Sequence, residues 1–232
     1  MFRYERPQKG RHREFWQLGV ELINARGFLA DYQILEIVYK ILSGLGVKDF
    51  VFNLNYLGNS ETKEKYKSKL KNFVEKTDPD LCRDCQIRYR TNPLRILDCL
   101  LCKEKFSFPS YKSAWDSKDS NYVSELNQLL DKFNFPYKYD YYLVRGLDYY
   151  TGLVFEVSLK SEKALLGGGR YDKLYQELGN TDVPALGFAI GIERLVDYLK
   201  ASQQSSELVK EDNKIDIFFF VSTPEFYLDV LV

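Results

Sequence analysis

The sequence predicts an α+β fold, and three observations lead to this expectation. Residues Arg13–Asn24 and Phe50–Leu57 alternate between apolar and polar side chains, which is the period of a β-strand. Residues Asp31–Leu45 and Asn121–Phe133 instead repeat their apolar side chains at helical spacing. At 232 residues we expect one large domain or one domain with a sizeable insertion, and the composition shifts toward lysine from about Gly58 to Phe135.

The amino-acid composition is typical of a folded protein with a buried core and balanced charge. Apolar residues make up 45% of the chain, enough for a buried core, and no long uncharged apolar run predicts a membrane span. The start of the chain is charged and lacks a signal-peptide core, so we expect a cytoplasmic location. Lysine plus arginine and aspartate plus glutamate both number 33. Contact with nucleic acid would therefore depend on local basic patches.

The first strands of the chain predict one polar and one apolar surface. Met1–Glu5 and Arg13–Asn24 are expected to be strands joined by a basic loop. One face of the second strand should pack on the core, and its residues are Trp16, Leu18, Val20 and Leu22. The opposite face carries side chains typical of a functional surface, Arg13, Phe15, Gln17 and Glu21. A surface hairpin with scattered charges fits the same residues. His12, in the loop, is interpreted as solvated.

The later elements are expected to surround a polar stretch. A helix should begin at Asp31 as its N-cap, and Phe50–Leu57 should be a central strand. In Leu143–Val157, the sequence LVRGLDYYTGLVFEV places a fixed cation, Arg145, beside two tyrosines, a combination suited to an anion and a flat polar ring. A hairpin with a solvated arginine is the alternative. The three glycines of Ala164–Gly169 favour either close packing or a phosphate cradle.

Four cysteines form two CxxC pairs, Cys82 with Cys85 and Cys99 with Cys102. Residues 86–98 separate the pairs, slightly fewer than in most zinc ribbons. Four thiolates would satisfy a tetrahedral zinc ion and stabilise a small domain with little core. Leucines nearby also allow the alternative that some of these cysteines are simply buried.

Three long stretches resemble histidyl-tRNA synthetases, which are class II aminoacyl-tRNA synthetases. They are MFRYERPQKGRHREFWQLGVE, RGLDYYTG followed by VFE, and LLGGGRYDKL with VPALGFAIGIERL. The resemblance implies an antiparallel sheet flanked by helices. It also implies a catalytic core at 1–57 and 136–200, an inserted domain at 58–135, a linker at 201–214, and the start of a truncated anticodon-binding domain at 215–232.

The resemblance implies site roles for the matching residues. Expected catalytic residues are Arg3, Arg145 and Arg194. Expected ATP-binding residues are Arg3, Glu5, Arg11, Phe15 and Arg194. Expected histidine-binding residues are Gln17, Glu21, Arg145, Tyr149, Tyr150 and Tyr171. An imidazole N–H group needs a hydrogen-bond acceptor, and a carboxylate such as that of Glu21 is a strong one.

The implied activity joins histidine to the 3′ end of tRNA(His) through histidyl-adenylate, with ATP and Mg²⁺, in a homodimer when full length. The family's first motif would precede Met1, so we expect this chain alone to aminoacylate weakly or not at all. The alternative is a histidine-sensing regulatory paralogue of ATP phosphoribosyltransferase. The presence of Arg3, Arg145, Arg194 and the insertion favours the synthetase. A zinc-containing RNA-binding module is a third interpretation.

Overall fold

The computed structural model describes residues 1–4, 12–77, 80–146, 149–159, 164–179 and 181–202. The chain divides into two compact units, Met1–Val196 and Asp197–Val232. Glu5 and Arg11, nearly all of the expected linker and the segment 215–232 lie outside the described residues. None of the described helices is both long and apolar enough to cross a membrane.

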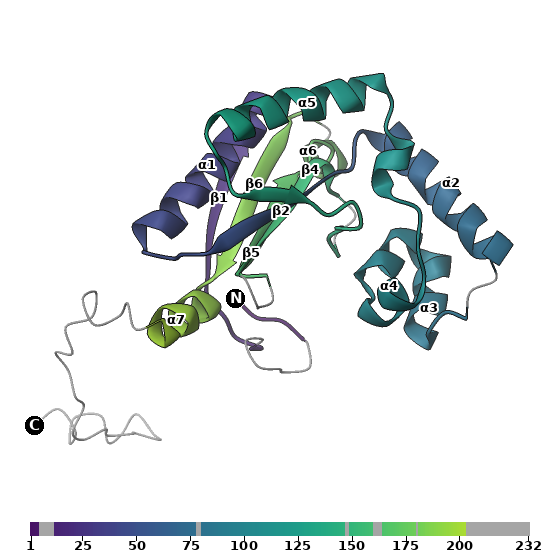
Figure 1. Ribbon diagram of the computed structural model, residues 1–232, viewed down its shortest axis with the longest axis horizontal. Coiled ribbons are helices and arrows are strands. Elements are labelled where there is room, and N and C mark those ends of the chain that lie inside the picture. The colour runs from purple at the N-terminus through teal and green to yellow at the C-terminus, as the bar shows by residue number, and fades with distance from the viewer. Residues whose placement is uncertain (5–11, 78–79, 147–148, 160–163, 180, 203–232) are drawn as a thin grey trace, which may run out of the picture. The chain divides into compact units, whose positions relative to one another are not determined.

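The described part of the first unit is built on a six-stranded sheet (Figure 1). The strands, in their order across the sheet, are β1 (Gln17–Ile23), β6 (Ala185–Gly191), β5 (Leu166–Arg170), β4 (Thr151–Leu159), β2 (Phe50–Tyr56) and β3 (Tyr137–Tyr139). All neighbouring strands run antiparallel except β2 and β3, which are parallel. The predicted α+β class is therefore confirmed, with a mixed pairing at one edge.

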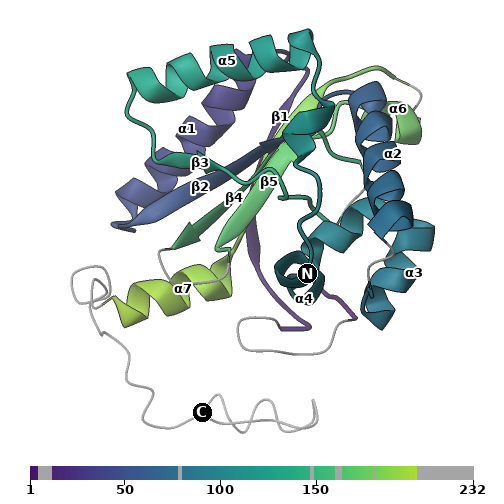
Figure 2. The same ribbon diagram turned by 45° about the vertical axis from the view of Figure 1, so that its right-hand side comes forward.

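Helices α1 (Phe28–Gly44) and α5 (Ser117–Lys132) lie side by side along the sheet (Figures 1 and 2). The predicted apolar face of α1 is buried, with Ile34 and Val38 fully covered. The expected N-cap at Asp31 is wrong, because the helix begins after Gly27 and Asp31 lies inside its first turn. The Asp31 carboxylate instead accepts hydrogen bonds from Arg170 at the end of β5.

The segment 58–135, expected as the insertion, is mainly helical. It contains α2 (Ser60–Thr77), α3 (Arg83–Thr91), the 3-10 helix η1 (Pro93–Asp98), α4 (Leu100–Lys105), the 3-10 helix η2 (Tyr111–Ala114) and also α5, which packs beside α1. Helices α2, α3 and α4 gather away from α1 and α5 (Figure 2). The stacked rings of Tyr66 and Tyr111, 4.1 Å apart, lie in a buried cluster that also includes Tyr150 and Val154 of the sheet region.

Two short helices follow the later strands. Helix α6 (Leu174–Gly179) follows β5, and α7 (Ile192–Ala201) follows β6 directly. At the other end of the chain, the strand expected over Met1–Glu5 is reduced to a single bridge between Phe2 and Glu14. Backbone hydrogen bonds of Arg3 to Arg13 and of Phe15 to Met1 extend this pairing.

Strand β1 corrects another expectation. Trp16 and Leu18 were expected on a core face, but they are 73% and 42% exposed. β1 lies at the edge of the sheet, and Trp16 directly precedes it. Alternation of side chains reveals that a strand has two faces, but it does not reveal whether another layer covers either face.

Candidate active site

Two cavities lie against the sheet and share one wall. The first, here called the Arg3 cavity, has a volume of about 520 Å³, and the second, the Glu21 cavity, about 810 Å³. Both volumes are in the range of pockets that hold small molecules. Four residues line both cavities: Gln17, Arg145, Gly167 and Ala189. A ligand in one cavity can therefore meet a ligand in the other beside the Arg145 guanidinium.

The Arg3 cavity combines cations with an aromatic ring. The Arg3 guanidinium carbon lies 4.5 Å from the centre of the Phe15 ring, and Arg3 Nε donates to the His12 carbonyl at 2.8 Å. Arg194, in the first turn of α7, donates through Nη1 to the carbonyl of Ala164 at 2.7 Å. The paired N-terminal segments that carry Arg3 and Phe15 thus meet the distant helix α7, which carries Arg194, at one cavity.

Arg145 lies on the sheet surface, where a carboxylate pairs with its guanidinium and a glycine leaves space for it. Its guanidinium forms an ion pair with Glu156 of β4. It passes over Gly167, where an added Cβ atom would lie 2.6 Å from Arg145 Nη1. Close approach is therefore one physical reason for a glycine at this position of β5. Close packing was one of the two roles expected for these glycines, whereas Glu156 was not expected as the partner of Arg145.

The Glu21 cavity pairs a carboxylate with a wall of tyrosines. Tyr171 donates its hydroxyl to the Glu21 carboxylate. The rings of Tyr149 and Tyr150 lie 4.8 Å apart, and Tyr171 meets Tyr149 edge-on at 5.7 Å. Partial burial raises the pKa of Glu21 above its usual range. Burial also raises the pKa of Tyr150, so this hydroxyl stays protonated at neutral pH and is able to donate.

A second glycine leaves room for Glu21. Gly187 of β6 lies opposite Glu21 in the register of β1 and β6, and a Cβ atom at Gly187 would collide with the Glu21 carboxylate. The structure thus brings together all the predicted ligand-binding residues that it describes. Residues of these walls that sequence reasoning missed include Asp98, Leu100, Glu156 and Glu193. Two of them, Glu156 and Glu193, belong to stretches that carry the resemblance, VFE and VPALGFAIGIERL, although neither was singled out.

A second arginine–carboxylate pair lies on the opposite face of β5. Arg170 and Asp31 are 5% and 0% exposed, and Arg170 Nη2 lies 2.6 Å from Asp31 Oδ1. Tyr122 of α5 donates its hydroxyl to the other carboxylate oxygen at 2.8 Å. Burial raises the pKa of Asp31 to about 6 against the lowering effect of Arg170, so the carboxylate is still ionised at pH 7. This pair joins α1, α5 and the sheet.

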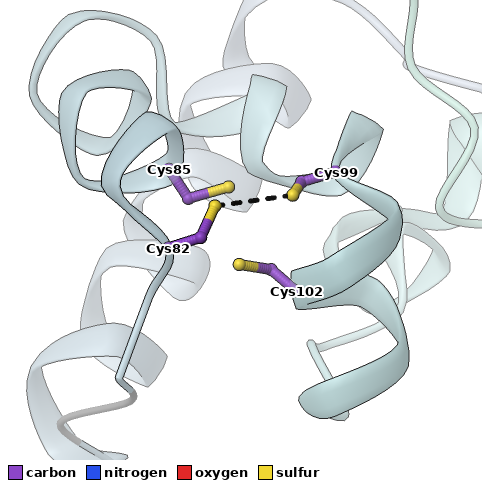
Figure 3. A group of neighbouring side chains, drawn as sticks. All are labelled: Cys82, Cys85, Cys99 and Cys102. Atoms are coloured by element: carbon purple, nitrogen blue, oxygen red, sulfur yellow. Dashed lines mark hydrogen bonds between the residues drawn. The ribbon is translucent and has the colours of Figure 1, made fainter.

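The four cysteines form a compact group in the insertion (Figure 3). Their Sγ atoms all lie within 4.8 Å of one another, and the side chains point toward a common centre. Cys85 and Cys102 are buried, whereas Cys82 and Cys99 are partly exposed. None of these four lines the Arg3 cavity or the Glu21 cavity.

Comparisons with known proteins agree on a family. The model of the family described as histidyl-tRNA synthetase matches residues 1–195. The chain is 39% identical over 223 residues to a histidine–tRNA ligase of Mycoplasma capricolum and 41% identical over 216 residues to that of Thermosipho melanesiensis. These alignments cover 94% and 91% of this chain, but 53% and 52% of the relatives. The chain thus spans about half the length of the curated relatives it matches.

Solved structures give the same result. Apo histidyl-tRNA synthetase of S. aureus superposes with a TM-score of 0.69 and 28% identity, covering 100% of this chain and 57% of that one. A Bacillus halodurans structure described as an ATP phosphoribosyltransferase regulatory subunit/histidyl-tRNA synthetase gives a TM-score of 0.57 over 81% of this chain and 54% of that one. At 24% identity, this second likeness shows the fold alone.

Proposed function

Because the chain belongs to the histidyl-tRNA synthetase family, we propose that its two joined cavities bind ATP and histidine side by side and form histidyl-adenylate. The observation that carries this proposal is the position of Arg145, which lines both cavities. The reacting groups of the two substrates have to meet where the cavities join. Holding them there would convert an encounter in solution into a reaction between positioned groups.

ATP is assigned to the Arg3 cavity. Arg3 and Arg194 supply guanidinium groups that suit phosphate oxygens, and Phe15 supplies an aromatic face for the adenine. Magnesium would enter with the ATP and offset part of the charge on its outer phosphates. The carboxylates of Asp98 and Glu193 line this cavity and offer the oxygen ligands that magnesium prefers.

Histidine is assigned to the Glu21 cavity. An imidazole N–H would donate to the Glu21 carboxylate, which already accepts a hydrogen bond from Tyr171. The rings of Tyr149 and Tyr150 would pack against the flat imidazole. In this orientation the substrate carboxylate points toward Arg145 and Gln17, which are shared by both cavities.

The proposed reaction is a displacement at phosphorus. A carboxylate oxygen of histidine forms a bond to the α-phosphorus of ATP, the bond from that phosphorus to the bridging oxygen breaks, and pyrophosphate leaves with the electron pair. Arg145 would stabilise the charge that develops on the α-phosphate oxygens. In the second step, a hydroxyl at the 3′ end of tRNA(His) would take the histidyl group and release AMP. We place this activity in the cytoplasm, where tRNA and ATP are available.

Thermal unfolding of this chain tests the two assignments separately. Histidine and ATP should each raise the melting temperature, because each binds the folded state. Phe15→Ala should abolish the response to ATP and keep the response to histidine. Glu21→Gln should weaken the response to histidine and keep the response to ATP. Trp16→Ala is a matched control for Phe15→Ala, because Trp16 is the neighbouring aromatic residue, is 73% exposed and does not line either cavity.

Two results would contradict the proposal. Stabilisation by histidine alone, with no response to ATP at any magnesium concentration, would favour a histidine-sensing subunit. Loss of both responses in Phe15→Ala, with the fold intact by circular dichroism, would contradict the separation of the two cavities.

A further inference from the structure

The cysteine group has the dimensions of a metal site. Tetrahedral zinc with sulfur ligands at about 2.3 Å requires sulfur atoms about 3.8 Å apart. The Sγ atoms of Cys82 and Cys99 are 3.7 Å apart, and all four sulfur atoms lie within 4.8 Å of one another. We propose that one zinc ion binds in this group, coordinated by the thiolates of all four cysteines, Cys82, Cys85, Cys99 and Cys102. The thiol protons would pass to solvent as the ion binds.

The local fold directs the sulfur atoms to one point. Cys82 is the residue that precedes α3, and Cys85 lies in the first turn of that helix. Cys99 precedes α4 in the same way, and Cys102 lies in its first turn. Each CxxC pair therefore presents two sulfur atoms from the start of a helix, and the two starts face each other (Figure 3). Four ligands from two such segments form a closed site with no open position for a substrate.

Few residues of α3 and α4 themselves are buried. Cys85 is the sole buried residue of α3, and Cys102 is the sole buried residue of α4. Ile87, Leu100 and Leu101 are instead 58%, 74% and 71% exposed. Helices this short do not persist in water without tertiary contacts. A metal ion that joins their first turns would add to the apolar contacts that α3 and α4 make with the buried residues of η1.

Other uses of the four thiols fit less well. A disulfide requires sulfur atoms about 2.05 Å apart, and the four described cysteines are free. Ordinary buried cysteines need not converge, and two of these are partly exposed. An iron–sulfur cluster places several metal ions between its cysteine ligands, whereas sulfur atoms this close leave space for a single ion. Among single ions, zinc matches a tetrahedral set of four thiolates.

The cysteine group is also connected to the Arg3 cavity, because sequence neighbours of one cysteine line that cavity. Asp98 and Leu100, the two neighbours of Cys99, line the Arg3 cavity. A zinc ion that fixes Cys99 would therefore fix part of that wall. This consequence depends on the proposed function: removal of the ion should weaken ATP binding and leave histidine binding unchanged, because none of the residues 82–102 lines the Glu21 cavity.

Metal analysis of the purified chain tests the site. We expect about one zinc per chain after gel filtration, and loss of at least nine-tenths of it in Cys99→Ser/Cys102→Ser. Leu101→Ser is the matched control, since Leu101 lies between the two ligands and is 71% exposed, and it should keep the metal. Cobalt added to the metal-free wild-type chain should give thiolate charge-transfer bands and the visible bands of tetrahedral cobalt, saturating at about one equivalent.

The cobalt titration keeps the proposal testable even when the double variant fails to fold. Zinc below a tenth of an equivalent, together with cobalt that gives no thiolate charge-transfer band, would overturn the site. Equal metal loss in Leu101→Ser and in the double variant would overturn the assignment of the ligands. A chain that contains zinc but does not respond to ATP would support the metal site and contradict the proposed function.

Discussion

Two arginine–carboxylate pairs lie against strand β5, with one pair on each face of the sheet. Arg170 and Asp31 are almost fully buried, and Arg170 also donates to the carbonyls of Ala25 and Gly27. Arg145 and Glu156 are 29% and 27% exposed, and both line the Arg3 cavity. The same pair of functional groups therefore serves two purposes. Where protein atoms use the donors, the pair fixes the fold, and where it faces a cavity, it is available to a ligand.

The largest expected effect concerns the buried pair. Arg170→Met should lower the free energy of unfolding by about 3–5 kcal/mol, because it leaves the Asp31 carboxylate buried without its cation. Urea denaturation would measure this loss. Arg26→Met is a matched control with an expected loss below about 1 kcal/mol, since Arg26 forms an exposed pair with Asp182. If Arg170→Met were as stable as this control, the result would contradict a stabilising role for the pair of Arg170 and Asp31.

The cavity pair should show the opposite behaviour. Arg145→Gln should slow histidine-dependent ATP–pyrophosphate exchange about 10²–10³-fold, because it removes the cation that we propose stabilises charge in the transition state. Its free energy of unfolding should change far less than that of Arg170→Met, since Arg145 is only half-buried. Arg90→Gln, on the exposed side of α3, should leave exchange unchanged. Equal loss of stability in Arg145→Gln and Arg170→Met would contradict the view that one pair stabilises the fold and the other serves a ligand.

The smallest expected effect depends on pH. The pKa of Glu21 is raised by burial, so its carboxylate becomes protonated at a higher pH than an ordinary glutamate. Protonation removes the anionic acceptor, and affinity for the substrate ring should fall as the pH is lowered through this pKa, by at most about tenfold per pH unit. A histidine analogue with a triazole ring that stays neutral in this range avoids titration of the ligand.

Calorimetric titration from pH 7 down to pH 4.5, the ordinary pKa of a glutamate, would span the raised pKa and measure this dependence. Glu21→Gln should bind the analogue weakly and with no dependence on pH, because it has no carboxyl group to titrate. Glu125→Gln, on the exposed side of α5, should behave like the wild-type chain. A pH dependence that persists unchanged in Glu21→Gln would assign the titration to another group.

The sequence predicted local features better than long-range partners. The helix at α1 and the strand at β2 followed from periodicity, and the two CxxC pairs indicated either four ligands of a zinc ion or buried thiols. Asp31 was misinterpreted because an aspartate near a helix start usually caps it. Its actual partner, Arg170, lies on β5, at a distance in sequence that no local pattern spans. Trp16 was misplaced for a related reason, because the order of strands in a sheet is not encoded in the alternation of any strand.

The resemblance predicted which residues form the candidate site, and the structure shows the contacts that arrange them. No local pattern indicates that Glu21 and Arg145 need glycines opposite them on β6 and β5. In the structure a Cβ atom at Gly187 would meet the Glu21 carboxylate and the Val20 carbonyl, and one at Gly167 would lie in the space of the Arg145 guanidinium. Glu156 was missed because a lone glutamate in an apolar strand has no distinctive spacing, and its partner precedes that strand.

The central claim is that both cavities open onto Arg145 and are filled together. Isothermal titration with a non-hydrolysable histidyl-adenylate analogue tests it most directly. We predict that this analogue binds the chain at least about 100-fold more tightly than histidine or AMP alone, since one ligand then fills both cavities without a second loss of translational freedom. We also predict that Arg145→Gln loses most of this gain. An analogue that binds no more tightly than AMP would contradict the joined site.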